Sequence, residues 1–392
     1  MELADSPEES AFRAGVRAWL AEALPRLPWP EPVDLVGKVP FWRQWQRALS
    51  DAGYAGLTWP REHGGQGLDA RFRAVFTEEA DRAGAPERLN TIGEDFAGPT
   101  LAAFGTDAQK ERFLAPILRG DDLWCQLFSE PESGSDLASL RSRAARVDGG
   151  WRISGQKIWT SRAHLAAHAI LLARTGGEDK PRHRGITYFV LPMDTPGVTV
   201  RPLRHMLGEA EFNEVFLDDV FVPDDLVVGE VDGGWAVAMA TLGFERVGIA
   251  TGRVNTRRAV EDIVAEVRAM TDAAGRPLGA DPAVRQRVAD LYGRALVHHA
   301  IGQRVLTAAA DGSAPGPATS IGKLYFCPLV EDLADFRQSL SPLGGQLAPE
   351  EQTAAESRWQ RLAYQARGTA IAGGSTFIQR NILAERLLGM PR

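Results

Sequence analysis

Strand-like segments are confined to one block of this chain, with helical patterns on both sides. Runs rich in β-branched and aromatic residues, such as AILLAR (169–174) and ITYFVLP (186–192), follow one another from about Leu123 to Val222. No helical pattern separates these runs, which favours an antiparallel sheet over alternating βαβ units. Residues 151–159 (WRISGQKIW) alternate around a Ser-Gly pair that predicts a turn. The block therefore predicts one antiparallel β-domain.

The flanking blocks carry helix signals. Ser6 and Glu9 form a capping box with Pro7 at the first helical position, and Thr106 with Gln109 forms another. Further helical stretches are expected at about 235–254, 255–272, 282–311, 316–340 and 350–389. We therefore predict an α+β fold with an N-terminal helical domain (1–122), a middle antiparallel β-domain (123–232) and a C-terminal helical bundle (233–392).

The composition limits the partners and the location. The 392 residues include 44 Lys and Arg against 51 Asp and Glu, and this net charge of −7 argues against nonspecific nucleic-acid binding. Cys125 and Cys327 are the two cysteines; they predict no disulfide framework and fit a reducing compartment. No apolar run approaches membrane-spanning length, and the start lacks the apolar region of a signal peptide. We expect a cytoplasmic protein that binds neither nucleic acid nor membrane.

One carboxylate lies in an unusually apolar helical stretch. Residues 235–254 carry only Glu245, Arg246 and Arg253 as charged side chains, and so apolar a helix usually lies at the centre of a bundle. A carboxylate in such a place is costly unless it is paired or used. Neighbouring positions on a helix point about 100° apart, so Glu245 and Arg246 do not face each other directly. From the residues alone, Glu245 is either the ion-pair partner of an arginine from another helix or a catalytic base.

Two further segments carry polar groups that suit a planar or anionic ligand. FSEPESGSDLASL (128–140) places hydroxyl groups and flexible backbone before a helix start, and QKIWTS (156–161) places a tryptophan beside hydroxyls. A solvated loop and a core tryptophan are the alternative readings. The chain has no P-loop, Rossmann glycine pattern, GxSxG elbow or HExxH motif. His164 and His168 are four residues apart without a third ligand, so no metal site is expected.

Several motifs, in order and nearly from end to end, resemble the acyl-CoA dehydrogenase family. They are GYAGLTWPREHGGQG (53–67), FGTDAQKERFLAPILRGDDLWCQLFSEPESGSDLASL (104–140), GQKIWTS, LLART, RPLRHMLGEAEFNEVFLDDVFVP, GGWAVAMATLGFER and GGSTFIQRNILAERLLGMPR. The resemblance implies a four-helix bundle as the C-terminal domain, FAD held at a subunit interface, and usually a tetramer. It also implies α,β-dehydrogenation of an acyl thioester, acyl-CoA to trans-2-enoyl-CoA. A carboxylate removes the α-proton as flavin N5 accepts the β-hydride, and an electron-transfer flavoprotein reoxidises the flavin.

The resemblance also assigns site residues. The expected FAD contacts are Gln126, Phe128, Ser129, Ser135, Trp159, Thr160, Ser161, Arg276, Gly344, Gly345, Ser375 and Phe377, and the expected substrate contacts are Ser135, Leu242 and Arg246. Two of these matches lie in altered motifs. The surroundings of Arg276 differ from the family pattern, and the flavin loop Gln-Ile-x-Gly-Gly is replaced by SPLGG (341–345).

The position of the base is the clearest departure. Many members carry the base in a Tyr-Glu-Gly-Thr-like stretch near the C-terminus, where this chain has Ala-Gly-Gly-Ser (372–375), so that Gly373 takes the place of the base. A minority pattern places the base on the first bundle helix, at the position of Glu245, and the resemblance therefore assigns this role to Glu245. The alternatives within the same fold are a dehydrogenase of carrier-protein-bound acyl groups, a flavin oxidase, or the partner subunit of a heteromeric enzyme. A homotetramer is expected, with a heterotetramer as the alternative.

Overall fold

The computed structural model describes residues 5–32, 34–177, 181–250, 255–310, 316–317, 319–341, 346–347 and 354–391, with only the backbone at 245–250, 309–310 and 354–355. By their contacts, the residues group into two compact units. The sheet unit comprises Gly15–Asp69 and Ala83–Glu245, and the bundle unit comprises Met1–Ala14, Ala70–Arg82 and Arg246–Arg392. This grouping does not follow the three predicted domains, whose boundaries stay a prediction.

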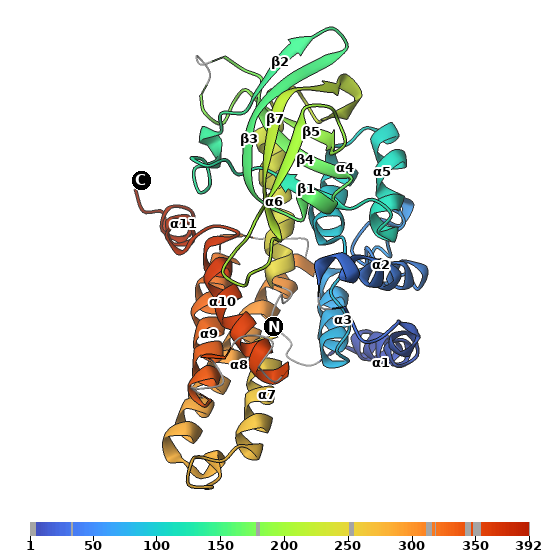
Figure 1. The fold of residues 1–392 in the computed structure, drawn as a ribbon. Coiled ribbons are helices and arrows are strands. Elements are labelled where there is room, and N and C mark those ends of the chain that lie inside the picture. Colours follow the sequence, from blue (N-terminus) through green and yellow to red (C-terminus); the bar gives the residue numbers. More distant parts are fainter. Residues whose placement is uncertain are drawn as a thin grey trace. The chain divides into compact units, whose positions relative to one another are not determined.

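The sheet unit is built on eight strands in the order β6-β7-β3-β2-β4-β5-β8, with β1 beside β4 (Figure 1). The strands are β1 (Trp124–Leu127), β2 (Arg143–Val147), β3 (Gly150–Ser161), β4 (His168–Arg174), β5 (Ile186–Pro192), β6 (Val198–Leu203), β7 (Phe212–Pro223) and β8 (Val227–Val228). Most neighbours are antiparallel, as predicted, and the structure adds parallel pairings of β1 and β2 with β4. The α+β fold class is confirmed.

The predicted Ser-Gly turn within 151–159 is wrong. Strand β3 continues through Ser154 and Gly155 and pairs with β7 over its whole length, with a register shift between Ile153 and Gly155. The glycine serves a close approach, because a Cβ atom at position 155 would lie 2.2 Å from Ser142 Oγ. A glycine inside a strand often marks such a contact.

The centre of the sheet is buried on both faces. Residues 169–173 of β4 and 186–191 of β5 are almost completely inaccessible to solvent. Continuous apolar runs such as AILLA and ITYFVL suit strands that are covered on both sides. The two runs that most clearly predicted strands therefore form the core of the sheet unit.

Helices complete the sheet unit. They are α2 (Leu35–Asp51), α4 (Gly98–Phe104), which follows a π-helix at Gly93–Ala97, α5 (Asp107–Arg119), and α6 (Gly234–Ala250) as far as Glu245. The predicted capping box of Thr106 and Gln109 is present at the start of α5. The Gln109 amide also donates to the carbonyls of Asp225 and Val227, at 2.7 and 2.8 Å, which joins α5 to the start of β8.

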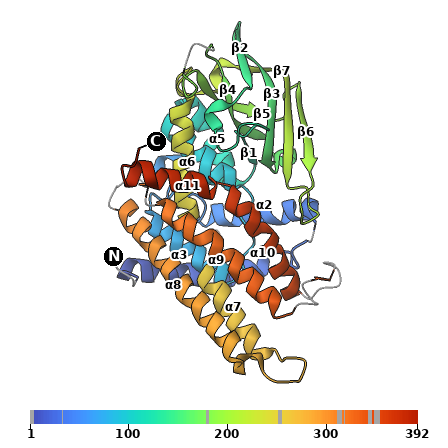
Figure 2. The same ribbon diagram turned by 90° about the vertical axis from the view of Figure 1, so that its left-hand side faces the viewer.

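The bundle unit contains the C-terminal helices (Figure 2). They are α7 (Thr256–Ala269), α8 (Pro282–Ala310), α9 (Thr319–Ser339), α10 (Ala354–Ile371) and α11 (Thr376–Ile382). Ile263, Leu291, Leu333 and Trp359 are fully buried and pack together, which places one apolar core between α7, α8, α9 and α10. The stretch predicted as one helix over 350–389 is divided between α10 and α11 by the turn at 372–375.

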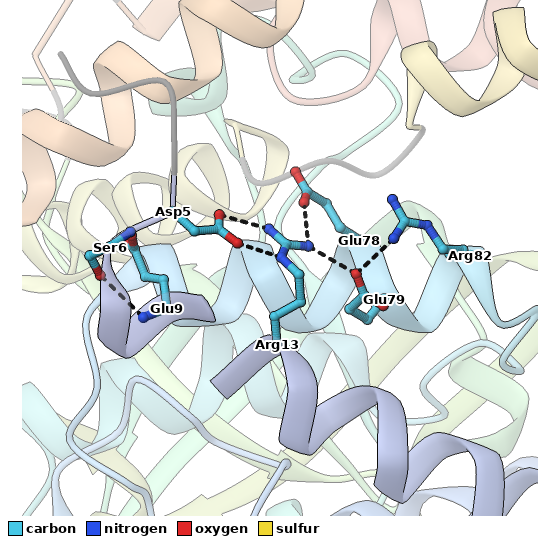
Figure 3. Close-up of polar contacts among 7 residues, drawn as sticks. All are labelled: Asp5, Ser6, Glu9, Arg13, Glu78, Glu79 and Arg82. Atoms are coloured by element: carbon cyan, nitrogen blue, oxygen red, sulfur yellow. Dashed lines mark hydrogen bonds and ion pairs between the residues drawn. The ribbon is translucent and has the colours of Figure 1, made fainter. Parts of the chain in front are cut away.

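Two N-terminal segments also belong to the bundle unit, namely the start of α1 (Pro7–Ala23) and α3 (Ala70–Arg82). Arg13 links them, because its guanidinium donates to Asp5 at 2.6 Å and to Glu78 and Glu79 at 3.0 Å each (Figure 3). The hydrogen bonds from Arg13 hold the pKa of Asp5 below its ordinary value.

The same close-up shows Ser6 and Glu9, where the predicted capping box is present (Figure 3). The Glu9 backbone N–H donates to Ser6 Oγ at 3.1 Å, and the Ser6 backbone N–H donates to Glu9 Oε2 at 2.7 Å. Among the helices that the structure describes, none is both long and apolar enough to cross a membrane.

Candidate active site

The two motifs predicted to contact a planar ligand lie side by side in the sheet unit. Phe128 and Ser129 follow the end of β1, and Trp159–Ser161 form the end of β3. The Ile158 backbone N–H donates to the Ser129 carbonyl at 3.0 Å, which joins the two segments. Ser129 and Ile158 are distant in the sequence, and the pairing of strands in the sheet brings the two segments together.

Trp159 is exposed in a strained backbone conformation. Its side chain is 61% exposed and its φ is 59°, which is rare for a bulky residue and costs about 1–2 kcal/mol. The register shift between β3 and β7 at positions 157–160 accommodates this conformation. The indole packs edge-on against Phe212, with 6.2 Å between the ring centroids. Strain of this kind tends to gather at functional sites, and here it presents an aromatic ring to solvent.

Thr160, next to this indole, has a buried hydroxyl that lacks a partner. The residue is 1% exposed, and its Oγ1 has no hydrogen-bond partner among the described residues. Buried hydroxyls are nearly always bonded, so an unbonded one calls for an explanation. The exposed aromatic face of Trp159 suits a planar ligand, and the residues present therefore fit a flavin.

A buried ion pair fixes the loop that follows Ser129. Lys157 is fully buried, and its Nζ donates to Glu130 Oε1 at 2.8 Å and to the carbonyls of Leu172 and Phe128 at 2.8 and 3.3 Å. The Glu130 carboxylate also accepts the backbone N–H groups of residues 141 and 142 at 2.5 and 2.9 Å. Glu130 thereby closes the 130–142 loop onto itself, and Lys157 fastens the loop to β3.

Both pKa values of this pair are shifted. Burial raises the pKa of Glu130, but the charge of Lys157 and the hydrogen bonds outweigh burial and leave the pKa below its ordinary value. Burial lowers the pKa of Lys157, and Glu130 opposes this only in part. Neither residue was singled out from the sequence. The sequence does hold one clue to this pair, because the two motifs, SEPESGSD and GQKIWTS, contain charged residues of opposite sign.

The other predicted contacts of the sheet unit differ in exposure. Gln126 is half-buried on β1, opposite Ile170 of β4. Ser135 is exposed on the loop, whereas the neighbouring Ser133 is buried and bonds the Ser139 hydroxyl at 2.8 Å. Leu242 is half-buried on α6. Their roles stay predictions.

The predicted base, Glu245, lies on the helical backbone of α6 together with Arg246. The side chains of both residues lie outside the part of the chain that the structure describes. The choice between a catalytic base and an ion-pair partner therefore stays a prediction.

The turn at 372–375 lies in the bundle unit. Gly373 and Gly374 have φ values of 64° and 92°, which strongly favour glycine. All three carbonyls of residues 372–374 accept from buried side chains. The Lys323 ammonium donates to Ala372 and to Gly374, the latter at 2.8 Å, and the Gln379 amide donates to Gly373 at 2.9 Å. These bonds hold a turn that disfavours a side chain at position 373.

Models of one family match the chain in three consecutive segments. The acyl-CoA dehydrogenase N-terminal domain matches residues 6–121, the middle domain matches 125–220, and the C-terminal domain matches 232–388. The chain belongs to the acyl-CoA dehydrogenase family. Members of this family are enzymes that dehydrogenate acyl-CoA substrates.

Individual relatives agree with the family assignment. Acyl-CoA dehydrogenase IpdE1 of Mycobacterium tuberculosis is 40% identical over 396 residues, covering 97% of each protein. The ChsE4-ChsE5 complex from Mycobacterium tuberculosis superposes with a TM-score of 0.88 at 28% identity over 100% of both chains. The Tcur3481-Tcur3483 steroid ACAD superposes with a TM-score of 0.86 at 30% identity, also over 100% of both chains.

Other predicted acyl-CoA dehydrogenase contacts lie in the bundle unit. Ser375 precedes α11 without a capping bond from its side chain, and Phe377 is 75% exposed. Arg276 is exposed and pairs with Asp272 at 2.7 Å. Gly344 and Gly345 lie outside the described residues. The assignment of all these residues to FAD stays a prediction.

The two histidines that are four residues apart have separate environments. His164 Nδ1 bonds Asn213 Oδ1 at 2.9 Å, whereas His168 stacks on Trp124 with 5.1 Å between centroids. Burial lowers the pKa of His168. In the described part of the chain, a different group of possible ligands, His205, Glu209 and Glu211, lies close together and half-exposed. Such groups are common without a cation, so they do not define a metal site.

Proposed function

We propose that this chain catalyses the FAD-dependent α,β-dehydrogenation of an acyl-CoA to its trans-2-enoyl-CoA, with Glu245 removing the α-proton. The family supports acyl-CoA dehydrogenation in general. The observation that carries the finer proposal is the strained and exposed indole of Trp159, on a strand that is joined to Ser129 by a backbone hydrogen bond. An aromatic ring exposed in this way suits the face of a flavin.

The proposed FAD contacts are those that the family resemblance assigns. In the sheet unit, Phe128 and Ser129 line one side, and Trp159 with Thr160 offers a ring face and a hydrogen bond. When bound, FAD supplies a two-electron acceptor for the β-hydride. Gln126, Ser135, Ser161, Arg276, Gly344, Gly345, Ser375 and Phe377 complete the proposed contacts, on the strength of the family resemblance.

Glu245 is proposed as the base because it falls at the family's alternative base position, on the first bundle helix. The α-proton of a thioester is weakly acidic, so the base must lie within hydrogen-bond reach of it. Gly373 supports the assignment, because it has no side chain and its φ of 64° disfavours one. Ser135, Leu242 and Arg246 are the proposed substrate contacts.

The nature of the acyl group is a separate question. One similar structure is called a steroid ACAD at 30% identity, which supports testing CoA esters with bulky polycyclic acyl groups beside linear and branched ones. An acyl-carrier-protein substrate or direct oxidation by oxygen stays an alternative within this fold. The proposed electron acceptor is an electron-transfer flavoprotein.

A homotetramer is the proposed assembly, and a heteromeric enzyme is the second candidate. The second candidate is favoured by the fact that two similar structures, ChsE4-ChsE5 and Tcur3481-Tcur3483, are complexes of two named chains. In such an assembly, this chain would contribute Glu245 and part of the flavin site.

The function is tested with the purified protein and a panel of acyl-CoA and acyl-carrier thioesters under anaerobic conditions. We expect bound flavin to be bleached by at least one acyl-CoA and the enoyl-CoA product to appear in equal amount. Absence of flavin in fresh protein, not restored by added FAD, would reject the proposal for the isolated chain. If co-expression with a related chain then restores flavin and turnover, the heteromeric candidate replaces the homotetramer.

A further inference from the structure

Three buried hydroxyl groups meet in the sheet unit. They belong to Thr100 on α4, Tyr188 on β5 and Thr241 on α6, and each residue is 0% exposed. Thr241 Oγ1 lies 2.8 Å from Thr100 Oγ1 and 3.3 Å from the Tyr188 hydroxyl. One side chain of α6 thus bonds two other elements of the unit.

The direction of the bonds follows from counting protons. Thr241 donates its only hydroxyl proton to the Val237 carbonyl at 3.0 Å. Thr241 Oγ1 can then accept from both Thr100 and Tyr188, and the Tyr188 hydroxyl also bonds Thr100. Deleting the Thr241 hydroxyl leaves Thr100 and Tyr188 to bond each other and removes the side-chain hydrogen bonds that hold α6 to α4 and β5.

Tyr188 connects this cluster to the proposed flavin segment. Its ring packs edge-on against Phe128, with 5.8 Å between centroids and an interplanar angle of 84°. The start of α6 also rests on the same strand, because a Cβ atom at Gly234 would lie 2.5 Å from the Tyr188 backbone nitrogen. Strand β5 therefore holds α6 at two points, one at its start and one two turns later.

Position 245 follows Thr241 by four residues, one turn along the helical backbone of α6. We propose that Thr241 is a positioning residue that sets the location of Glu245 relative to the flavin segment, acting through Tyr188 and Phe128. This inference rests on the proposed function. The α-proton and the β-hydride leave from adjacent carbons, so their acceptors must keep a fixed separation, and a misplacement of about 1 Å can cost about 10²-fold in rate.

The test compares Thr241→Val, which keeps the shape, with Thr241→Ser, which keeps the hydroxyl. We expect Thr241→Val to lower the rate of flavin reduction by about 10- to 100-fold. FAD content and the Kd for acyl-CoA should change by less than about twofold, since no ligand contact is removed. Thr241→Ser should restore most of the rate.

Gln46→Met serves as the matched control. Gln46 lies on α2, is 0% exposed, and its amide donates to Glu94 and to the Leu118 carbonyl. This variant should lower the thermal midpoint as Thr241→Val does, yet reduce flavin at the wild-type rate. Equal losses of rate in both variants would mean that general destabilisation is responsible, and the inference would be overturned.

Two further outcomes decide the remaining cases. If Thr241→Val does not fold, Tyr188→Phe removes the hydroxyl and keeps the ring against Phe128. A loss of several-fold in rate then supports the inference, and a wild-type rate overturns it.

Failure of the base assignment is recognised separately, because Glu245→Gln would then reduce flavin at the wild-type rate. If Glu245→Gln reduces flavin slowly while Thr241→Val reduces it at the wild-type rate, the base assignment holds and the inference about Thr241 is overturned.

Discussion

The hydroxyl of Thr160 is buried without a partner among the described residues, and leaving such a group unbonded costs about 1–3 kcal/mol. If FAD is the missing partner, Thr160→Val has opposite effects on the two forms of the protein. The apoprotein should be as stable as wild type or more stable, whereas FAD should bind about tenfold more weakly, which corresponds to one hydrogen bond of about 1.4 kcal/mol. Urea unfolding of the apoprotein and titration with FAD measure the two effects.

Thr187→Val is the matched control for Thr160→Val. Thr187 is equally buried, but its hydroxyl bonds Thr175 at 2.7 Å and accepts the Asp232 backbone N–H at 2.8 Å. The control should lose stability and keep its FAD affinity. Unchanged FAD affinity in Thr160→Val would show that the hydroxyl does not face the flavin.

The ion pair of Glu130 and Lys157 gives a second prediction at this scale. Lys157→Met leaves a buried carboxylate without its counter-charge and should lower the free energy of unfolding by about 3–5 kcal/mol. The double variant Glu130→Gln/Lys157→Met removes both charges and should lose clearly less. Urea unfolding at neutral pH measures these losses. If the loss in the double variant equals the sum of the losses in Lys157→Met and Glu130→Gln, the pair is not coupled.

The pair also predicts a pH dependence. The pKa of Glu130 lies below its ordinary value of 4.5 in the folded protein, with burial opposing and the Lys157 charge favouring the shift. A depressed carboxyl pKa contributes stability that is present above pH 4.5 and is lost as the pH falls through the folded-state pKa. The double variant should therefore lose less stability on acidification below pH 4.5 than wild type does.

Single residues were predictable from the sequence where a motif carried them. Trp159 and Thr160 were named from their motif, but the left-handed backbone of Trp159 lies at a register shift between β3 and β7 that the motif does not reveal. Lys157 was passed over because nothing local shows that a lysine in a strand is fully buried; its three acceptors come from segments distant in sequence.

At the scale of elements, sequence patterns predicted the structure correctly where the contacts responsible lie between residues close together in the chain. The capping boxes at Ser6 and Thr106 are present because both partners lie within three residues of each other. The Ser-Gly pair at 154–155 was misread, because a glycine required by close packing has the same sequence as a glycine required by a turn. The contact that requires it comes from Ser142, on another part of the chain.

The turn between α10 and α11 gives a prediction that has an internal control. Gly373→Ala puts a side chain at a φ of 64° and should destabilise the protein by about 1–2 kcal/mol. Gly368 lies within α10, and an added Cβ there meets nothing within 4 Å, so Gly368→Ala should stabilise the protein by about 0.5–1 kcal/mol. Thermal unfolding of the two variants measures this difference. Equal shifts would mean that the turn tolerates a side chain, and that this argument against a base at 373 is wrong.

For the whole molecule, the order of helical, strand and helical blocks was sufficient to predict the fold class. The ordered motifs were sufficient to predict the family. The grouping by contacts was not predictable, since α3 belongs with the C-terminal helices and is held to α1 by the long-range bonds of Arg13.

The proposed assembly predicts the effect of a surface charge. Ile371, Leu388 and Met390 are 73%, 70% and 55% exposed, and large exposed apolar side chains are often covered in contacts between subunits. Leu388→Glu should shift the protein from a tetramer toward smaller species in light scattering. Val36→Glu is the control, because Val36 on α2 is 77% exposed and should tolerate the charge. A wild-type protein that stays at the 42.6 kDa mass of one chain would contradict a homotetramer.

The central claim is that the chain dehydrogenates an acyl thioester with Glu245 as its base. The most direct measurement is the rate of flavin reduction by a saturating acyl-CoA in a single anaerobic turnover, in wild type, Glu245→Gln and the exposed control Glu230→Gln. Glutamine keeps the size and hydrogen bonding of glutamate but cannot take the proton. We predict wild-type flavin content in all three proteins, a wild-type rate in Glu230→Gln, and a rate at least about 10²-fold lower in Glu245→Gln. Reduction of the flavin in Glu245→Gln at the wild-type rate would contradict the account.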